Sequence, residues 1–144
     1  MFTGIVESKS LKAKLTKKSF GAELSVSVEN GFTKNLKKGD SIAVNGVCLT
    51  VCSFSKKIIK FEIIHESLRL SNLVKNISMP LNLERSLKMG EEIGGHLVSG
   101  HVHCMGKVKE FKKGKEKILT ISKPSLVKEY IFQKGYVAIN GISL

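Results

Sequence analysis

The sequence predicts an all-β protein in which a small closed antiparallel barrel of six strands is followed by the first half of a second copy. Three observations indicate this fold. Apolar and polar residues alternate with a period of two along much of the chain, and turn signals recur about every 8 to 15 residues in the first part. Two motifs of the first part also return later in the same order. Closing the strands into a barrel would leave no exposed edge.

The internal repeat is clearest in an eight-residue motif. Ile42–Leu49 aligns residue for residue with Val137–Leu144, and the one chemical change replaces a cysteine with a serine. A second pair, Met1–Val6 and Leu97–Val102, shares two apolar residues, a hydroxyl, a glycine, any residue and a valine. The two matches lie 95 and 96 residues apart, which is long enough for each copy to be a domain.

The repeat length predicts the domain organisation. We expect a first barrel over residues 1–96 and about half of a second barrel over residues 97–144. The chain is therefore expected to be truncated at its C-terminal end relative to a complete two-barrel protein. Half a barrel would expose apolar faces and unpaired strand edges unless another chain completed it.

Six strands are expected in the first copy. The alternation of Leu24–Val28 is the clearest half-buried strand, and Asn45-Gly46 is a strong signal for a tight turn between two strands. Pro80 suits the first residue of a strand. The expected strands are Gly4–Glu7, Leu24–Val28, Ser41–Val44, Cys48–Phe54, Ile58–Ile64 and Leu81–Glu84, with helical turns at Phe32–Leu36 and His65–Leu73.

The second copy restarts after an expected linker over Ser86–Gly95. Alternation and turn residues predict strands at Gly100–Phe111, Lys117–Ser122 and Val137–Ile139, with a helical turn at Ser125–Phe132.

Composition limits the class of protein. Hydrophobic residues make up 42% and charged residues 25% of the chain, as in ordinary globular domains. No apolar run approaches the ~20 residues of a membrane span, and the N-terminus lacks the layout of a signal peptide. We therefore expect no membrane partner. Three cysteines are too few for a disulfide framework, so we expect a reducing cytoplasmic location.

The net charge of +12 raises the possibility of a nucleic-acid partner. Only Arg69 and Arg85 among the 24 basic residues are arginines, and the chain has no tryptophan. Nucleic-acid sites favour arginine for base readout and aromatic rings for stacking. A solvated, lysine-rich surface with no nucleic-acid partner is the preferred interpretation.

Six ordered motifs carry a resemblance to a known family: MFTGIVE, GDSIAVNGVCLTV, ESLRLSNL, LNLERSLK, GGHLVSGHVH and KGYVAINGISL. With these motifs the chain resembles the riboflavin synthases of the alpha-chain type. The resemblance implies tandem six-stranded Greek-key β-barrels, a homotrimer, and lumazine synthase as a possible partner. It also implies a transferase that dismutates two molecules of 6,7-dimethyl-8-ribityllumazine. One molecule passes a four-carbon unit to the other, which yields riboflavin and a diaminopyrimidine without a metal or a redox cofactor.

The resemblance also implies two related substrate sites, each shared between the first barrel of one subunit and the second barrel of its neighbour. Such sites need polar groups for the ring edge and apolar walls for the ring faces. The first-copy residues are Gly4, Ile5, Val6, Cys48, Leu49, Thr50, Glu62, Ile63, Ile64, His65, Glu66 and Ser67. The second-copy residues are Gly100, His101, Val102, Lys134, Ile142, Ser143 and Leu144.

Three residues are candidates for the chemical steps. His101 is the first candidate for proton transfer because imidazole titrates near working pH, although it could equally be a hydrogen-bonded strand residue. Cys48 could add to the ring or could be a small buried hydrophobe. Ser41 could donate a hydrogen bond to the substrate. Phe2 and Thr3 either cover the site from the N-terminus or belong to the core.

Four possible metal ligands lie around the start of the second copy without forming a complete ligand set. His96, His101, His103 and Cys104 lie close in sequence, but no carboxylate or second cysteine pair completes a ligand set. We therefore expect no metal. His96 is kept as a weaker candidate for the site than His101.

Two other functions remain open. A non-catalytic lumazine or flavin carrier of the same fold would share the barrel repeat, because fold alone does not determine function. The presence of His101, Cys48 and Ser41 favours the enzyme. A basic nucleic-acid-binding barrel would show steep salt dependence and ranks last.

The turn at Ile77–Pro80 departs from the family pattern without touching the expected site residues.

Overall fold

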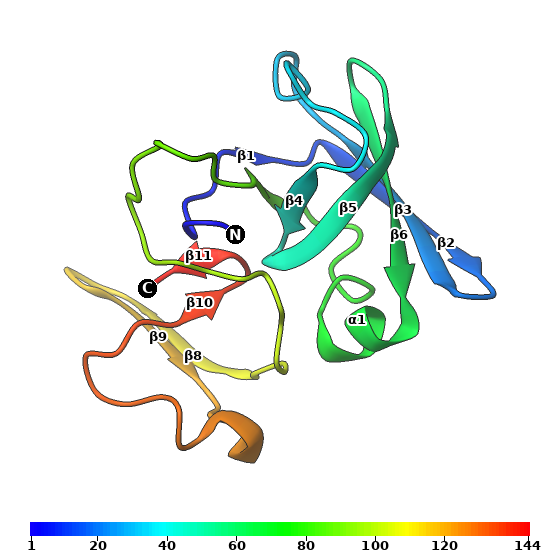
Figure 1. Cartoon of the computed structure of the whole chain (residues 1–144). Helices are drawn as coiled ribbons and strands as arrows, with labels where there is room; N and C mark the ends of the chain where they lie inside the picture. Colours follow the sequence, from blue (N-terminus) through cyan, green and yellow to red (C-terminus); the bar gives the residue numbers. More distant parts are fainter.

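The computed structural model describes every residue from Met1 to Leu144 and is almost entirely β (Figure 1). It contains one short helix and one 3-10 turn. The elements are β1 (Ser8–Lys9), β2 (Lys12–Lys18), β3 (Gly21–Ser27), β4 (Ser41–Val44), β5 (Val47–Phe54), β6 (Ile58–Ile64), α1 (His65–Leu70), β7 (Asn82–Arg85), β8 (Val108–Lys113), β9 (Lys117–Ile121), the 3-10 turn Ser125–Val127, β10 (Ala138–Ile139) and β11 (Ile142–Ser143).

The first seven strands form one antiparallel sheet in the order β1-β7-β4-β5-β6-β3-β2. Its two outermost strands, β1 and β2, are separated only by Ser10 and Leu11. The amide of Ser10 donates to Leu81 and the amide of Leu11 donates to Ser27. The continuous segment that contains β1 and β2 therefore pairs with β7 through β1 and with β3 through β2. This segment closes the sheet into a barrel and removes its free edges.

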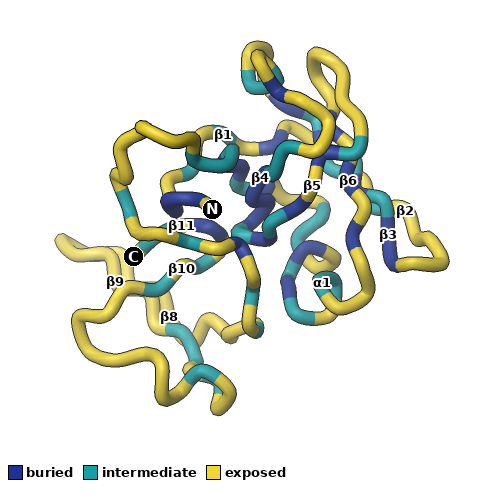
Figure 2. Tube along the Cα trace, in the orientation of Figure 1, coloured by how far each residue is buried: buried dark blue, intermediate teal, exposed yellow.

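The connections follow a Greek-key pattern. β3 pairs with β6 and β4 pairs with β7, so β3 and β4 are consecutive in the chain without being neighbours. The alternating side chains that face inward form a core of 15 buried apolar residues that includes Leu24, Val26, Ile59 and Phe61. In Figure 2 the buried segments gather in this barrel.

The later part of the chain forms two small hairpins instead of a second closed barrel. β8 pairs only with β9, and β10 pairs only with β11. All six residues of β8 are exposed, and Figure 2 shows the hairpin and the following loop almost wholly on the surface. The apolar side chains of Phe111, Leu119 and Phe132 are among those exposed, as the half-barrel expectation required.

Most expected elements are confirmed, with five differences. One is the short strand β11 at Ile142–Ser143, which was not expected. The strand β2 was missed because its sequence, KAKLTKK, is dominated by lysine and only Ala13 and Leu15 point inward. The strand expected at Gly4–Glu7 is wrong: the first strand is Ser8–Lys9, since the preceding residues cross to the later part of the chain. The strand expected from Gly100 begins only at Val108. Residues 31–35 form turns without a helix.

No helix of the structure has the length and apolar character needed to span a membrane.

Candidate functional site

A row of three residues crosses the outer face of the barrel. Ala43 on β4 lies opposite Cys48 on β5 and opposite Glu84 on β7. Residues directly opposite one another in antiparallel strands point to the same face. Their neighbours Ile42, Val44 and Leu83 fill the core, so this row faces away from it. Glu84 is nevertheless buried and Cys48 is half-buried, because other segments cover the row.

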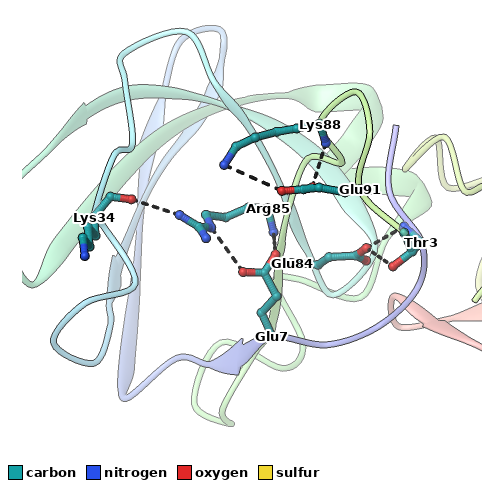
Figure 3. Close-up of polar contacts among 7 residues, drawn as sticks. All are labelled: Thr3, Glu7, Lys34, Glu84, Arg85, Lys88 and Glu91. Carbon is teal, nitrogen blue, oxygen red and sulfur yellow. Dashed lines mark hydrogen bonds and ion pairs between the residues drawn. The ribbon is translucent and has the colours of Figure 1, made fainter. Parts of the chain in front are cut away.

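The N-terminal segment covers the Glu84 end of the row (Figure 3). The Glu84 carboxylate accepts hydrogen bonds from the Thr3 amide, from Thr3 Oγ1 at 2.8 Å and from the Gly4 amide at 3.1 Å. A buried carboxylate is costly unless its oxygens are hydrogen-bonded. This carboxylate therefore fixes the position of Thr3 and Gly4 on the barrel.

A segment of the second copy covers the Cys48 end. Phe2 and Val98 form an antiparallel bridge with reciprocal hydrogen bonds of 2.8 and 2.9 Å, so the two segments run side by side. The Cys48 amide donates to the Gly100 carbonyl at 2.8 Å. Gly100 has a φ of +79°, and a Cβ there would lie 2.6 Å from the Cβ of Cys48. Only glycine allows this close approach of the two backbones.

The same contact occurs again with the copies exchanged. The Ser143 amide donates to the Gly4 carbonyl at 2.9 Å, and Gly4 has a φ of +75°. A Cβ on Gly4 would lie 2.5 Å from the Cβ of Ser143. Gly4 of the first copy thus meets Ser143, while Gly100 of the second copy meets Cys48. The family resemblance groups Gly4 with Cys48 and Gly100 with Ser143, each within its own copy.

The hairpin turns of the two copies meet back to back. Asn45-Gly46 and Asn140-Gly141 all have positive φ, as a two-residue type I′ turn requires. A Cβ on Gly46 would lie 2.7 Å from the amide nitrogen of Gly141, and one on Gly141 would lie 2.8 Å from that of Gly46. Both chain ends consequently lie in the same region of the molecule (Figure 1).

A histidine joins this crossing. His96 Nδ1 lies 2.6 Å from Ser143 Oγ, and its ring stacks on Tyr136 with centroids 4.3 Å apart and planes 6° apart. The His96 amide donates to the Thr3 carbonyl at 2.9 Å. His96, expected to be the weaker candidate, therefore has a side-chain bond to a predicted site residue.

The remaining first-copy residues lie at one end of the barrel. Val51 on β5 pairs with Phe61 on β6, so the segment that begins at Glu62 lies at the same end as Thr50. Ile63 is buried, Ser67 is half-buried, and Glu62, Ile64, His65 and Glu66 are exposed at the junction of β6 with α1. His65 Nε2 bonds to the Ser19 carbonyl.

The other predicted residues are less tightly held. His101 is exposed, and its amide bonds to Ser99 Oγ. Thr50 is exposed and lies opposite Ser41, with Leu49 buried between Thr50 and Cys48. Lys134 is exposed in a left-handed conformation with a φ of +62°. Ile5, Val6, Val102, Ile142 and Leu144 are exposed or half-buried apolar residues, and Phe2 and Thr3 are buried.

Ser41 also lines a polar groove of about 210 Å³ that contains no other predicted site residue. Arg85 lies in this groove, where its guanidinium bonds to Glu7 Oε2 at 3.2 Å and to the Lys34 carbonyl at 3.0 Å (Figure 3). Lys88 and Glu91 pair at 3.8 Å nearby. Positive and negative charges are both present, so the groove has no single charge to select a ligand.

His96, His101, His103 and Cys104 do not gather into a metal-binding group, and no other set of such side chains does.

Two residues of the site were missed by sequence reasoning. Alternation places Glu84 on the outer face, where a carboxylate is ordinarily solvated, and nothing local indicates that Thr3 and Gly4 cover it. Tyr136 was read only as part of the repeat motif. Its meeting with His96 across 40 residues depends on the crossing of the two copies, which no local pattern indicates.

Comparison with known proteins matches this arrangement to a family. The lumazine binding domain matches residues 3–86 and again residues 99–144. The riboflavin synthase of Buchnera aphidicola subsp. Baizongia pistaciae is 42% identical over the whole chain, which spans 69% of that protein. The Escherichia coli riboflavin synthase is 33% identical, also with 100% of this chain and 69% of that protein covered.

Solved structures show the same fold. LumP complexed with riboflavin superposes with a TM-score of 0.87 at 23% identity, covering 99% of this chain and 78% of that one. LumP complexed with 6,7-dimethyl-8-(1'-D-ribityl) lumazine gives a TM-score of 0.83 at 22% identity, covering 100% and 78%. From the domain matches and the whole-length relatives, the chain belongs to the riboflavin synthase family, a family of transferase enzymes built from lumazine-binding domains.

Proposed function

We propose that the chain binds 6,7-dimethyl-8-ribityllumazine and takes part in its dismutation. In that reaction one lumazine gives up a four-carbon unit and becomes the diaminopyrimidine, while the other accepts the unit and becomes riboflavin. Relatives named riboflavin synthase that match along the whole chain support the activity. The observation that carries the proposal is the reciprocal crossing in which Gly4 meets Ser143 and Gly100 meets Cys48.

The crossing supports two half-sites, each of which combines residues of both copies, one at Gly100 and Cys48 and the other at Gly4 and Ser143. One combines Gly100–Val102 with Cys48–Thr50 and the segment Glu62–Ser67. The other combines Gly4–Val6 with Ile142–Leu144. A reaction between two copies of one substrate needs two similar sites, and the internal repeat supplies them.

The chemistry of the residues suits a flat heterocycle with a polar edge. Ile5, Ile64, Ile142 and Leu144 expose apolar side chains that could contact ring faces. The Ser143 hydroxyl lies at the same crossing, where it could bond to the ring edge. Within this proposal, His101 transfers the proton, Cys48 shapes the site or adds to the ring, and Ser41 and Lys134 contribute polar contacts.

The exposed apolar faces of β8, β9 and the following loop support further proposals about assembly. We infer that residues 1–96 and 97–144 are separate domains, and that the second is completed by self-association. A homotrimer, an association with lumazine synthase and a cytoplasmic location belong to the same proposal.

Fluorescence titration of the lumazine into the chain tests the proposal, followed by detection of riboflavin. Binding with riboflavin formation is expected if neighbouring chains complete the shared site. Binding without turnover would leave the chain as a lumazine carrier under these conditions. No binding at millimolar lumazine would overturn the proposal. The double variant G4A/G100A, which disrupts both crossings, serves as the matched control and should lose binding.

A further inference from the structure

The His96 imidazole is held by two contacts and its backbone by a third, although the residue lies at the surface. Its ring stacks in parallel on Tyr136, its Nδ1 contacts Ser143 Oγ, and its amide bonds to Thr3. An exposed histidine otherwise moves among rotamers. Here Tyr136 determines the plane of the ring, and Nδ1 points at Ser143, the residue that replaces Cys48 in the second copy.

This arrangement makes the two half-sites chemically different. In the first copy Cys48 presents a free thiol, which is a weak hydrogen-bonding group and has no hydrogen-bonded imidazole. In the second copy Ser143 presents a hydroxyl bonded to His96. The backbone contacts with Gly100 and Gly4 are otherwise equivalent.

We propose that Tyr136 is a positioning residue that holds His96 against Ser143, so that the two side chains form the polar edge of the second half-site. The identity of the ligand rests on the function proposed above. When Nδ1 carries no proton, Ser143 donates to it and the hydroxyl oxygen accepts from a ligand N–H. When Nδ1 is protonated, it donates to Ser143, and the hydroxyl proton is free to reach a ligand carbonyl. The pair can therefore match either kind of group on the edge of a lumazine ring.

Tyr136 contributes little to the packing of the protein, so a purely structural role does not explain its position. The residue is 61% exposed and lies outside the buried core, so its removal changes little buried area. The variant Y136A should therefore fold, and Y136F keeps the stacking ring while it removes the hydroxyl. These two variants separate the effect of the ring from the effect of the phenol.

The first test measures the imidazole directly by long-range ¹H–¹⁵N NMR of the full chain, with H96Q used to assign the His96 signals. We expect one dominant hydrogen-bonded tautomer in the wild type and in Y136F, and averaged tautomers in Y136A. Unchanged His96 signals in Y136A would overturn the positioning role, as would an equal loss in Y136F. This measurement needs no ligand.

The second test measures the affinity for lumazine. The variant H96A identifies which binding event involves His96, and the affinity of that event is then compared among the Tyr136 variants. Loss of an aromatic pair corresponds to about a three- to tenfold weaker affinity, which we expect for Y136A, with less than about a twofold change for Y136F. In the H96A background, Y136A should have no further effect. The same loss in that background would contradict an action through His96. Absence of lumazine binding in the wild type would instead refute the proposed function, and the NMR result would still decide the role of Tyr136.

Discussion

The hairpins β4–β5 and β10–β11 have nearly the same sequence and the same turn geometry, yet their surroundings differ. Asn45 and Asn140 have φ values of +47° and +50°, and the glycines after them have +81° and +79°. The side chains of Val47 and Leu49 are each only 4% exposed, whereas their equivalents Ile142 and Leu144 are 41% and 59% exposed. Local sequence therefore determines the turn, while burial depends on which strands lie beside it.

The same contrast extends to the whole copies. In the first copy, seven strands form one sheet around a single core, and the continuous segment that contains β1 and β2 closes this sheet. In the second, each hairpin has only its own two strands. Two-stranded hairpins are marginal on their own, so residues 97–144 depend on contacts with the first copy. The following changes test that dependence, from the largest expected effect to the smallest.

Phe61→Ala should produce the largest loss of stability. Phe61 is fully buried in the barrel core, and truncation of such a residue costs about 3 to 5 kcal/mol. Phe111→Ala in the exposed hairpin is the matched control and should change the free energy of unfolding by less than about 1 kcal/mol. Urea unfolding followed by circular dichroism measures both, and similar losses would contradict the contrast between the copies.

Gly100→Ala should separate the copies without damaging the core. The positive φ and the 2.6 Å approach to the Cys48 Cβ leave no room for a methyl group. We expect a loss of about 2 to 3 kcal/mol and faster hydrogen exchange at the Phe2 and Val98 amides. Gly114→Ala, where the nearest atom is 3.7 Å away, should stay within about 0.5 kcal/mol. If Gly100→Ala leaves these amides protected, the crossing does not depend on this contact.

Glu84→Gln tests the attachment of the N-terminal segment. The amide replaces a charged acceptor of three hydrogen bonds with a neutral group, which should cost about 2 kcal/mol and expose the Thr3 and Gly4 amides to exchange. The exposed Glu110→Gln is the control. Equal exchange rates in the variant and the wild type would show that the other contacts of the segment, including the Phe2–Val98 bridge, are sufficient to hold it.

Asn45→Ala and Asn140→Ala compare the equivalent turns directly. Asn45 is buried, its Oδ1 accepts from the Asn82 amide at 2.8 Å, and its own amide donates to the Asn82 carbonyl at 2.8 Å. Asn140 is exposed, and its Oδ1 accepts from Asn72. We expect losses of about 1 to 2 kcal/mol for Asn45→Ala and about 0.5 to 1 kcal/mol for Asn140→Ala in thermal or urea unfolding. An equal cost would mean that burial does not distinguish the turns.

The sequence alone was sufficient for the β class, for five of the seven strands in the first sheet, for the repeat and for the family. Each of these depends on local information: alternation with a period of two, the Asn-Gly turns, and motifs read in order. The strand Lys12–Lys18 was not predicted, because its lysines obscure the alternation of apolar and polar residues. All of its residues nevertheless pair with β3.

Only the tertiary structure decided which copy supplies which part of the candidate site. Gly4 and Ser143 lie 139 positions apart, and Glu84 is buried only because Thr3 and Gly4 fold over it. Likewise, His96 and Tyr136 meet only where the two copies cross. Periodicity assigns a residue to the inner or outer face of a strand, but what covers the outer face depends on long-range packing. That packing has no local signal in the residues themselves.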